Sequence, residues 1–498
     1  MSGTDYRDGP GAAADVTRED ATVVVLGDAM LDVWKWGRCE RLCREAPVPV
    51  VDIERSSSVA GGAGNTAANV AALGADTRLL ALTGDDAPAT ALAEVLARSG
   101  VDIGRIYRAP DRTTPVKTRI VADEQILVRF DDASTGDARP HEVAEMLDRL
   151  DDALIGAEAL IVCDYGGPLG DTLREGLLQR REHLPLLIVD THHPARWRAL
   201  HPDLVTPNAG EAAEVLGLAA AAGAHPEQRA ELFDRHREAL FDAIGTRTAV
   251  VTLDRDGSVL LDGDRPAHRT WAHPVRESQS AGGGDTFVAA LTLAVLAGMP
   301  LTGAVEVAQA AADVVVHRSG TSVCTREQLR ARIDRSGGAV LEPRQLIEAV
   351  RGHRAAGERI VFTNGCFDVV HAGHIAYLNE AKRLGDVLVV AVNSDDSVRR
   401  LKGPDRPVNP DYDRCAVLAA LSCVDHVTVF DEDTPERLLR ATEPDLYVKG
   451  GDYRPEMLPE TPIVAEYGGE VRVLGYLADH STSAMIERIR ARSATGGG

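Results

Sequence analysis

The stretch TNGCFDVVHAGHIAYLNEAKRLGD, residues 363–386, is the most informative segment of the chain. It predicts a strand, a short loop and then a helix whose first turn carries His371 and His374. The i, i+3 spacing places both imidazoles near the same helix end. There, with the helix-terminal amides, they can face a triphosphate and stabilise charge on its α-phosphate and on departing pyrophosphate. A two-histidine metal site or purely structural histidines are the alternatives, but neither explains the preceding Asn-Gly-Cys-Phe-Asp.

On both sides of this stretch, short apolar β-rich runs alternate with Ala- and Leu-rich amphipathic segments. This rhythm is typical of a mainly parallel sheet covered by helices. The β-rich runs include TVVVLGD (22–28), ALIVCDYG (159–166), LPLLIVD (184–190), TAVVTLD (248–254), DVLVVAVNSD (386–395) and DHVTVFDED (425–433). The rhythm pauses where RSGGAV interrupts polar helical sequence. We therefore expect separate α/β domains at 21–325 and 357–490, a linker at 326–356, and disordered tails at 1–20 and 491–498.

The composition is that of an ordinary globular protein. A chain of 498 residues exceeds what one hydrophobic core usually serves, so at least two domains are expected. The formal charge of −22 argues against nucleic acid or an anionic membrane as a partner, because binding to either rests on clustered Lys and Arg. Seven scattered cysteines, no signal-peptide pattern and no long apolar stretch favour a cytoplasmic protein.

A second informative segment, SAGGGDTFVAALTLAVLAG (280–298), is a glycine cluster that ends in an acid and runs into an apolar helix. Its free amides can point at an anion, assisted by the helix dipole. Asp285, in the first turn, is then placed to take a proton from a substrate hydroxyl while those amides stabilise a transferred phosphoryl group. A flexible turn that merely carries an N-terminal acid is the plainer alternative.

Two other segments favour the catalytic interpretation. GGAGNTAANVAALGA (61–75) also opens an Ala-rich helix, and its Asn65 and Asn69 can hydrogen-bond a polyhydroxylated ligand. TPNAGE (206–211) follows a predicted strand. In this order the three segments resemble the ribokinase-like (PfkB) family of carbohydrate kinases, over about residues 20–325.

This resemblance implies roles for individual residues. It implies that Asp285 is the catalytic base and that Gly282, Gly283 and Gly284 form an anion hole. It places Asn208 and Glu211, as an N-x-x-E motif, near magnesium and phosphate. The sugar contacts that it implies are Asp32, Gly61, Gly62 and Asn65.

The opening GDAMLDVWKWGRCERLCREAPVPV (27–50) resembles the heptose 7-phosphate kinase branch of that family. Asp28 and Asp32 are suited to accept hydrogen bonds from sugar hydroxyls, although isolated Asp residues there are often turn residues. The substrate's distal phosphate has candidate partners in Lys117, Arg119 and Arg129. Each of these three could equally be a solvated strand charge.

The chain departs from the branch in two places. It reads DYGGPLG at 164–170 where the family carries a Lys-bearing D-Y-x-K-G stretch, and Cys43-Arg44 where Ser-Pro is usual. Both departures bear on which sugar is bound.

Around residues 357–490 the chain resembles the cytidylyltransferase-like nucleotidyltransferases, through their G-x-F-D-x-x-H-x-G-H signature. Further segments resemble the heptose 1-phosphate adenylyltransferase branch: AVNSDDSVRRLKGPDRPVNPDYDR (391–414), DEDTPERLL (431–439), PDLYVKGGDY (444–453) and STSAMI (481–486). The resemblance implies that His371 and His374 act on phosphates. The nucleotide-binding residues that it implies are Gly365, Phe367, Asp368, Lys402, Lys449, Ser481, Thr482 and Ser483. Arg414 is either structural or a nucleotide contact.

The chemistry of the two reactions agrees with this division. A sugar 1-phosphate is largely ionised at neutral pH, its second pKa being about 6, so its attack on ATP needs no protein base. A sugar hydroxyl is not ionised, and the N-terminal half supplies Asp285 for it.

The sequence therefore predicts a bifunctional enzyme with a ribokinase-like α/β domain followed by a Rossmann-like nucleotidyltransferase α/β domain. It would phosphorylate D-glycero-β-D-manno-heptose 7-phosphate at O1 and adenylylate the corresponding 1-phosphate. ATP serves both reactions with Mg²⁺, no metal is bound directly by the protein, and a homodimer is expected. The alternatives are the same chemistry on another sugar or nucleotide, or a sensor with a degraded kinase half.

Overall fold

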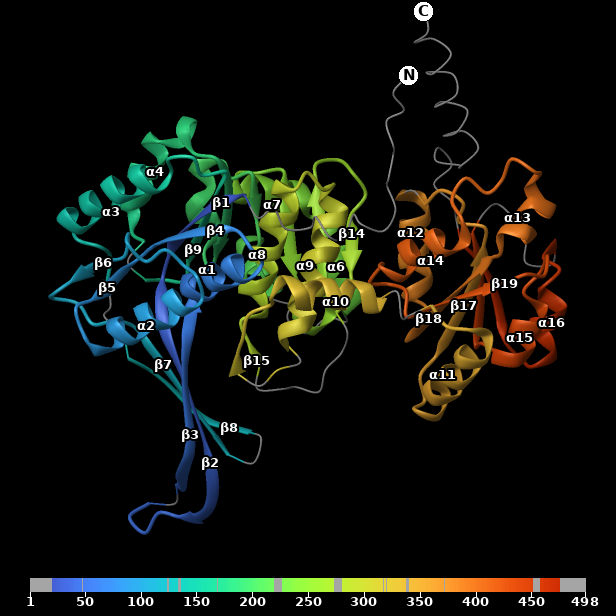
Figure 1. Ribbon diagram of the computed structural model, residues 1–498, viewed down its shortest axis with the longest axis horizontal. Helices are drawn as coiled ribbons and strands as arrows, with labels where there is room; N and C mark the ends of the chain where they lie inside the picture. Colours follow the sequence, from blue (N-terminus) through green and yellow to red (C-terminus); the bar gives the residue numbers. More distant parts are fainter. Residues whose placement is uncertain are drawn as a thin grey trace, which may run out of the picture. The chain divides into compact units, whose positions relative to one another are not determined.

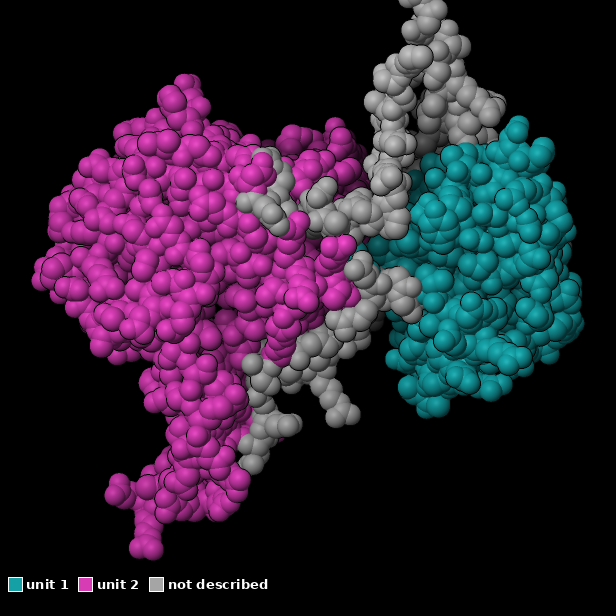
Figure 2. Space-filling view, in the orientation of Figure 1, with its two compact units in different colours: residues 1–13, 333–498 teal, residues 14–332 magenta. Residues whose placement is uncertain are grey.

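The computed structural model divides the chain into two compact units, one ending at Arg332 and one continuing from Ile333 (Figure 2). The residues that it describes are 20–46, 48–122, 125–132, 136–167, 169–218, 226–272, 280–316, 318, 320–336, 340–370, 372–450 and 457–474. Each unit is an α/β structure, as the sequence predicts (Figure 1). Within the described residues, no helix is both long enough and apolar enough to cross a membrane.

The first unit is built on an eight-stranded sheet in the order β14-β13-β12-β11-β10-β9-β1-β4. Its strands are β1 (Thr22–Gly27), β4 (Asp76–Leu80), β9 (Ala159–Asp164), β10 (Leu186–Thr191), β11 (Leu204–Val205), β12 (Thr248–Thr252), β13 (Ser258–Asp262) and β14 (His268–Thr270). Within this sheet the neighbouring strands β4, β1, β9, β10, β11 and β12 are parallel to one another, whereas β13 is antiparallel to both β12 and β14. Central strands such as β1 are apolar and buried because helices cover both faces of a parallel sheet.

Helices from different parts of the chain cover the two faces. One face packs on α3 (Pro140–Ala153), α4 (Asp171–Gln179), α5 (Ala209–Val215), α6 (Pro226–Arg235) and α7 (Arg237–Ile244), and their apolar side chains share one core with Val24 and Leu26 of β1. The other face packs on α1 (Ala63–Ala72), α8 (Gly283–Leu296) and α9 (Leu301–Val316). The carboxyl ends of β9 and β10 thus lie beside the beginnings of α1 and α8.

A second, four-stranded sheet projects from this unit and is called the lid here (Figure 1). It consists of β2 (Ala29–Leu42), β3 (Pro49–Gly62), β7 (Val116–Ala122) and β8 (Gln125–Asp132). The long β2–β3 hairpin contains register shifts at Trp36/Gly37 and Arg38/Arg41. All the residues of β8 are exposed. Only Asp28 separates the end of β1 from the beginning of β2, and β3 is followed directly by α1. The base of the lid, called its root, therefore lies next to the beginning of α1.

Shorter elements complete the first unit. They are β5 (Leu82–Gly84), β6 (Tyr107–Ala109), β15 (Ser280–Ala281), β16 (Gly320–Thr321), α2 (Ala87–Arg98), α10 (Arg326–Ser336) and the 3-10 helices η2 (Arg181–His183), η3 (Pro194–Leu200) and η5 (Asp254–Asp256).

The second unit is a five-stranded, fully parallel sheet in the order β19-β18-β17-β20-β21. Its strands are β17 (Ile360–Gly365), β18 (Val387–Asn393), β19 (His426–Phe430), β20 (Leu446–Gly450) and β21 (Glu470–Leu474). The helices α11 (Pro343–Ala355), α15 (Glu436–Thr442) and α16 (Thr461–Glu466) pack on one face. The helices α12 (Ala372–Lys382), α13 (Asp395–Lys402) and α14 (Asp411–Ala419) contact the sheet strands from the other. The strand order reverses beside β17, which is where ligands bind in open α/β sheets.

The segment 326–356, expected to be a linker, contains α10 and α11. Arg332 of α10 pairs with the buried Asp313, at 3.3 Å. Leu346 and Val350 of α11 are buried in the core of the second unit. Most of this segment therefore belongs to the packed structure of one unit or the other, because its apolar positions have a core to enter.

The buried ion pair of Arg112 and Glu142 allows a test of how α3 is held in place. Glu142 is almost completely buried and accepts hydrogen bonds from the Arg112 guanidinium, at 3.0–3.2 Å, and from the Arg139 amide at 2.6 Å. Burial raises the pKa of Glu142, but these hydrogen bonds outweigh it and hold the pKa below its ordinary value.

We predict that Glu142→Gln lowers the free energy of unfolding of the first unit by about 3 kcal/mol, because Arg112 is left buried without its counter-charge. The control is Glu145→Gln on the same helix, where the pair with Arg149 is partly exposed and worth less than about 1 kcal/mol. Urea unfolding of both variants would measure the difference. Equal losses would show that the buried pair is not what holds α3.

Candidate functional site

The carboxylate of Asp285 lies in the first turn of α8 and is held by α1. Asn65 donates from Nδ2 to Asp285 Oδ2 at 2.7 Å, and Thr66 donates to Oδ1 at 3.4 Å. Burial, together with the nearby charges of Asp190 and Asp32, raises the pKa of Asp285 to about 7, although the Asn65 hydrogen bond opposes the rise. A carboxylate with this pKa is matched to take a proton near neutral pH.

Two residues to which the sequence analysis gave no role, Tyr165 and Asp190, complete the surroundings of Asp285. The Tyr165 hydroxyl donates to Asp190 Oδ2 and lies 3.1 Å from Asp285 Oδ1. Asp190 also accepts from Thr206 at 3.0 Å, and burial raises its pKa to about 6. The sequence could have suggested both residues by their positions, because Tyr165 directly follows β9 and Asp190 lies near the end of β10, and ligands bind at the carboxyl ends of parallel strands.

Of the three predicted anion-hole glycines, Gly282 has a specific steric role. It caps α8 in the left-handed region, at φ 92°, and a Cβ there would lie 2.4 Å from Asn65 Nδ2. Gly283 and Gly284 begin the helix, and a Cβ on Gly284 would meet open space. The close approach of backbone and Asn65 is what brings Asn65 onto Asp285.

The predicted sugar-contact residues gather at the root of the lid. Asp28 is buried and accepts from the amides of Tyr165 and Gly167 at 2.7 and 2.8 Å, and burial raises its pKa to about 6. A Cβ on Gly167, where the family carries its Lys, would lie 2.4 Å from Asp28 Oδ1, so a side chain here would have to displace the Asp28 carboxylate.

Asp32 is also buried here. It accepts from Thr321 at 3.0 Å and pairs with Arg119 at 3.3 Å. Gly61 sits against it, since a Cβ there would be 2.9 Å from Asp32 Cγ, and Gly62 caps α1 at φ 56°.

The three predicted phosphate-binding cations are not equivalent. Lys117 and Arg119 lie on β7 beside Asp32 and Trp34 of β2. Arg119 is largely buried and its guanidinium lies 4.8 Å from the Trp34 ring. Arg129, on the exposed β8, pairs with Asp131 at 3.1 Å, which matches the alternative of a solvated strand charge.

Asn208 and Glu211 form a capping box at the beginning of α5. Asn208 Oδ1 accepts from the Glu211 amide at 2.9 Å, and Glu211 Oε2 accepts from the Asn208 amide at 2.8 Å. Glu211 Oε1 lies 2.7 Å from Nδ1 of His192, and this hydrogen bond raises the pKa of His192. His192 lines a pocket with Arg196 and Glu211, and its ring packs on that of Tyr165, whose hydroxyl contacts Asp285.

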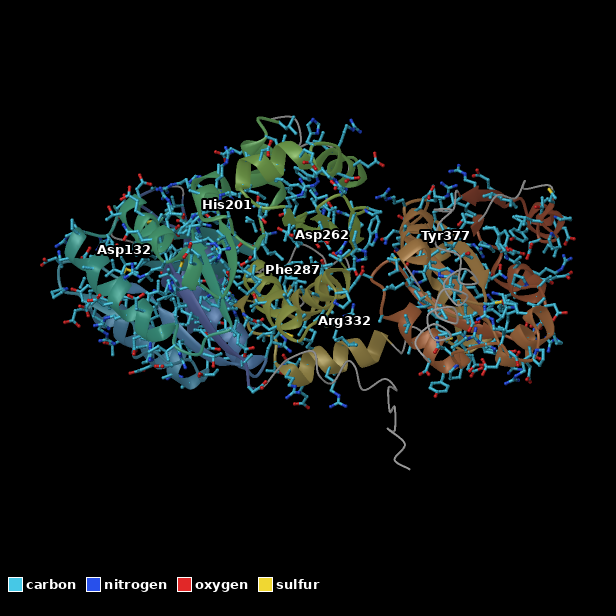
Figure 3. The ribbon with its side chains drawn as sticks, turned by 90° about the horizontal axis from the view of Figure 1, so that it is seen from above. Asp132, His201, Asp262, Phe287, Arg332 and Tyr377 are labelled. Carbon is cyan, nitrogen blue, oxygen red and sulfur yellow. The ribbon has the colours of Figure 1, made fainter. Side chains whose placement is uncertain are left out.

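In the second unit, polar groups collect at the carboxyl ends of β17 and β20. Lys449 donates to Asn364 Oδ1 at 2.8 Å and lies 3.6 Å from Glu460 Oε1. Burial lowers the pKa of Lys449. Beneath it, the Tyr377 hydroxyl of α12 contacts Thr363 at 2.5 Å and donates to the Val448 carbonyl at 3.1 Å (Tyr377 is labelled in Figure 3). This network fixes a cation at the reversal point of the sheet.

The loop after β17 is shaped by Phe367 and Asp368. Phe367 has φ 44° and its ring lies 5.4 Å from that of His374. Asp368 is buried, pairs with Arg406 at 2.7 Å and accepts from the Val408 amide at 2.6 Å. Its carboxylate therefore anchors the 403–410 loop to the loop after Gly365.

Arg414, which the sequence left open between two roles, is buried and bonds to the Cys366 and Asn409 carbonyls and to Asp395. In this structure it ties the same loops together.

The remaining predicted residues are less informative. Lys402 is exposed in the last turn of α13. His371, Ser481, Thr482 and Ser483 lie outside the described residues.

Comparison with known proteins gives matches for both units. Residues 20–328 match the pfkB family carbohydrate kinase family, and residues 362–475 match the cytidylyltransferase-like family. The chain is 40% identical over 476 residues to bifunctional protein HldE of Hahella chejuensis, covering 95% of this chain and 97% of that protein. It is 40% identical over 483 residues to bifunctional protein HldE of Pseudomonas aeruginosa, covering 95% and 98%. Phosphofructokinase-2 from Escherichia coli has a similar fold, with 17% identity, a TM-score of 0.51 and coverage of 63% of this chain and 97% of its own.

The contact between Gly282 and Asn65 yields a prediction about stability. We expect Gly282→Ala to lower the melting temperature of the first unit, because alanine is strained at φ 92° and its Cβ displaces Asn65. The expected loss is about 2 kcal/mol. Gly284→Ala adds the same methyl group two residues later into open space and should leave the melting temperature unchanged or raised. Calorimetry of both variants decides, and a Gly282→Ala protein as stable as its control would contradict the steric argument.

Proposed function

The chain belongs to the pfkB family of carbohydrate kinases and to the bifunctional HldE proteins, and from this membership we propose its substrates and the roles of its residues. It is an enzyme that joins a sugar kinase to a nucleotidyltransferase. The kinase transfers phosphate from ATP to O1 of D-glycero-β-D-manno-heptose 7-phosphate. The nucleotidyltransferase converts D-glycero-β-D-manno-heptose 1-phosphate and ATP to ADP-heptose and pyrophosphate.

The observation that carries the kinase assignment is the partly buried Asp285 carboxylate at the beginning of α8, held by Asn65. In our proposal it removes the proton of the O1 hydroxyl. The amides of Gly282, Gly283 and Gly284, at the positive end of the helix, stabilise the charge on the transferred phosphoryl group. Asp28, Asp32 and the lid root bind the sugar.

The 7-phosphate is assigned to cations of the lid. Lys117 and Arg119 are on β7 beside Asp32, so a sugar held by Asp32 has positive charge within the same sheet. Arg129 is a more distant third contributor.

Magnesium enters this proposal with ATP, as the ion bound to its phosphates, where it neutralises charge. Among the residues that the structure describes, no group of three or more His, Cys, Asp and Glu is arranged to hold a metal. In this proposal Asn208 and Glu211 lie near the phosphate-bound ion, as the N-x-x-E motif implies, and their capping box holds both side chains in place.

In the nucleotidyltransferase the sugar 1-phosphate is already ionised and attacks the α-phosphate of ATP unaided. His371 and His374 act on the phosphates. Lys402 and Lys449 stabilise the transition state, and Ser481, Thr482 and Ser483 close over the triphosphate. Gly365 and Phe367 shape the loop beneath the nucleotide, and Asp368 acts there by anchoring that loop.

We further propose that the enzyme works in the cytoplasm as a homodimer joined through the lid, with neither nucleic acid nor membrane as a partner. Val128 and Phe130 pair with Ile120 and Thr118 of β7, so they share one face of the lid, and each is nearly half exposed. A second copy of the lid would cover this apolar stripe.

The kinase assignment predicts a clean separation of the two activities. We expect Asp285→Asn to lose at least 10²-fold in formation of heptose 1,7-bisphosphate, because no base remains at the hydroxyl. Formation of ADP-heptose from supplied heptose 1-phosphate should stay unchanged. The measurement is mass spectrometry after incubation with ATP, Mg²⁺ and each sugar phosphate, with other hexose phosphates and CTP as comparisons. If the Asp285→Asn variant still formed the bisphosphate, Asp285 would not be the catalytic base. Preference for another sugar or for CTP would overturn the substrate assignment.

The lid assignment makes a separate prediction about assembly. We expect Phe130→Asp to convert the dimer to a monomer, because a charge then sits in the apolar stripe. Leu178→Asp is the matched control, since Leu178 is similarly exposed but lies on α4, away from the lid. Light scattering coupled to gel filtration measures the mass of each. A wild-type monomer, or dissociation in both variants, would refute a lid-mediated dimer.

A further inference from the structure

Three side chains from separate elements form a hydrogen-bonded chain beside the proposed base. Asp285 comes from α8, Tyr165 from the loop after β9, and Asp190 from β10. The Tyr165 hydroxyl is 3.1 Å from Asp285 Oδ1 and closer still to Asp190 Oδ2. One hydroxyl thus connects two carboxylates that lie 95 positions apart in the sequence.

The number of protons shared by Asp285, Tyr165 and Asp190 determines how many of these groups can be hydrogen-bonded at once. A tyrosine hydroxyl has one hydrogen, so it can donate to only one carboxylate at a time. When both carboxylates are ionised, they share this one hydrogen, so at any moment either Asp190 Oδ2 or Asp285 Oδ1 is without it. If Asp285 carries a proton, it can donate to the Tyr165 oxygen while Tyr165 donates to Asp190. One added proton therefore satisfies all three groups at once.

The charged surroundings favour that added proton. Asp285 faces Asp190 and Asp32, with Tyr165 and Cys163 as the other titratable neighbours. Asp190 faces Glu211, whose charge is partly offset by His192. Like charges in a buried site disfavour full ionisation, as they do when two carboxylates share one proton.

We propose that Asp190 is a positioning residue of the kinase reaction, which shares through Tyr165 the proton that Asp285 takes from the sugar. The inference rests on the proposed role of Asp285. The O1–H bond breaks and an O–H bond forms on Asp285, while O1 attacks the γ-phosphorus and the bond to the β-γ bridging oxygen breaks, releasing ADP. The Asp285 proton then passes to the Tyr165 oxygen as the Tyr165 proton passes to Asp190. Asp190 releases this proton to water, which restores both carboxylates for the next substrate.

The test is the pH dependence of the kinase kcat/KM in Asp190→Asn and Tyr165→Phe. In the wild type, kcat/KM should fall as pH drops through about 7, where Asp285 of the free enzyme becomes protonated. Asp190→Asn removes a neighbouring negative charge, so this fall should move to lower pH by about one unit. Tyr165→Phe removes a hydrogen bond that stabilises ionised Asp285, so the fall should move to higher pH. Both should lower the maximal kcat about tenfold, with KM for the sugar changed less than about threefold.

Asp164→Asn is the matched control. Asp164 is a buried carboxylate next to Tyr165, but it accepts from Trp197 Nε1 at 2.8 Å, whereas the Tyr165 hydroxyl bonds to Asp190 and Asp285. Its variant should keep the wild-type position of the acid limb, and thermal unfolding of all the variants corrects for lost folded protein.

Unshifted profiles in both Asp190→Asn and Tyr165→Phe, or shifts of the same sign, would overturn the proposal. An active Asp285→Asn enzyme would instead refute the base itself, so the two failures are distinguishable.

Discussion

The hydrogen bond from Asn65 to Asp285 joins the two helices on which the kinase site depends. It spans 2.7 Å between the first turns of α1 and α8, and a second link one turn further on connects Thr286 to Asn69 at 2.9 Å. Asn69 also accepts from the Cys324 amide at 3.0 Å, which brings in the segment after β16. Because β3 of the lid runs straight into α1, the same contacts that orient the base also fix the root of the lid. Sugar binding and proton removal are therefore set by one small, buried polar network.

Sequence reasoning succeeded where residues adjacent in the chain act together. The α/β architecture, the glycine cluster before α8 and the loop after β17 all follow from local patterns of apolar residues and glycines. The sequence could not show that Tyr165 and Asp190 meet Asp285, because that meeting depends on strand order and on three segments far apart in the chain. Likewise, the sequence does not show which face of a predicted strand carries a charged side chain. The largely buried pair of Arg119 with Asp32 could therefore not be distinguished from the exposed pair of Arg129 with Asp131.

The second unit shows a different limit of sequence reasoning. A signature residue can support a site without facing the ligand, and Asp368 and Arg414 are both committed to hydrogen bonds within the protein. They hold the loops that surround the carboxyl ends of β17 and β20, where Lys449 is fixed by Asn364 and Glu460. The sequence alone does not distinguish an Asp or Arg that binds a nucleotide from one that shapes the nucleotide-binding loop. Only their burial and their partners separate the two roles.

The two units therefore handle protons in opposite ways, and their buried charges reflect it. Where an alcohol must be ionised, the first unit gathers carboxylates, and burial together with the neighbouring negative charges raises the pKa of Asp285 to about 7, so that it can hold a proton near neutrality. Where the nucleophile is already an anion, the second unit instead places the partly buried cation Lys449 next to the carboxylate of Glu460, and burial lowers the pKa of Lys449. Clustered acids would repel a phosphate nucleophile, and a lone cation could not deprotonate a hydroxyl. Each arrangement suits one reaction and would hinder the other, which is a physical reason for the chain to carry two separate sites.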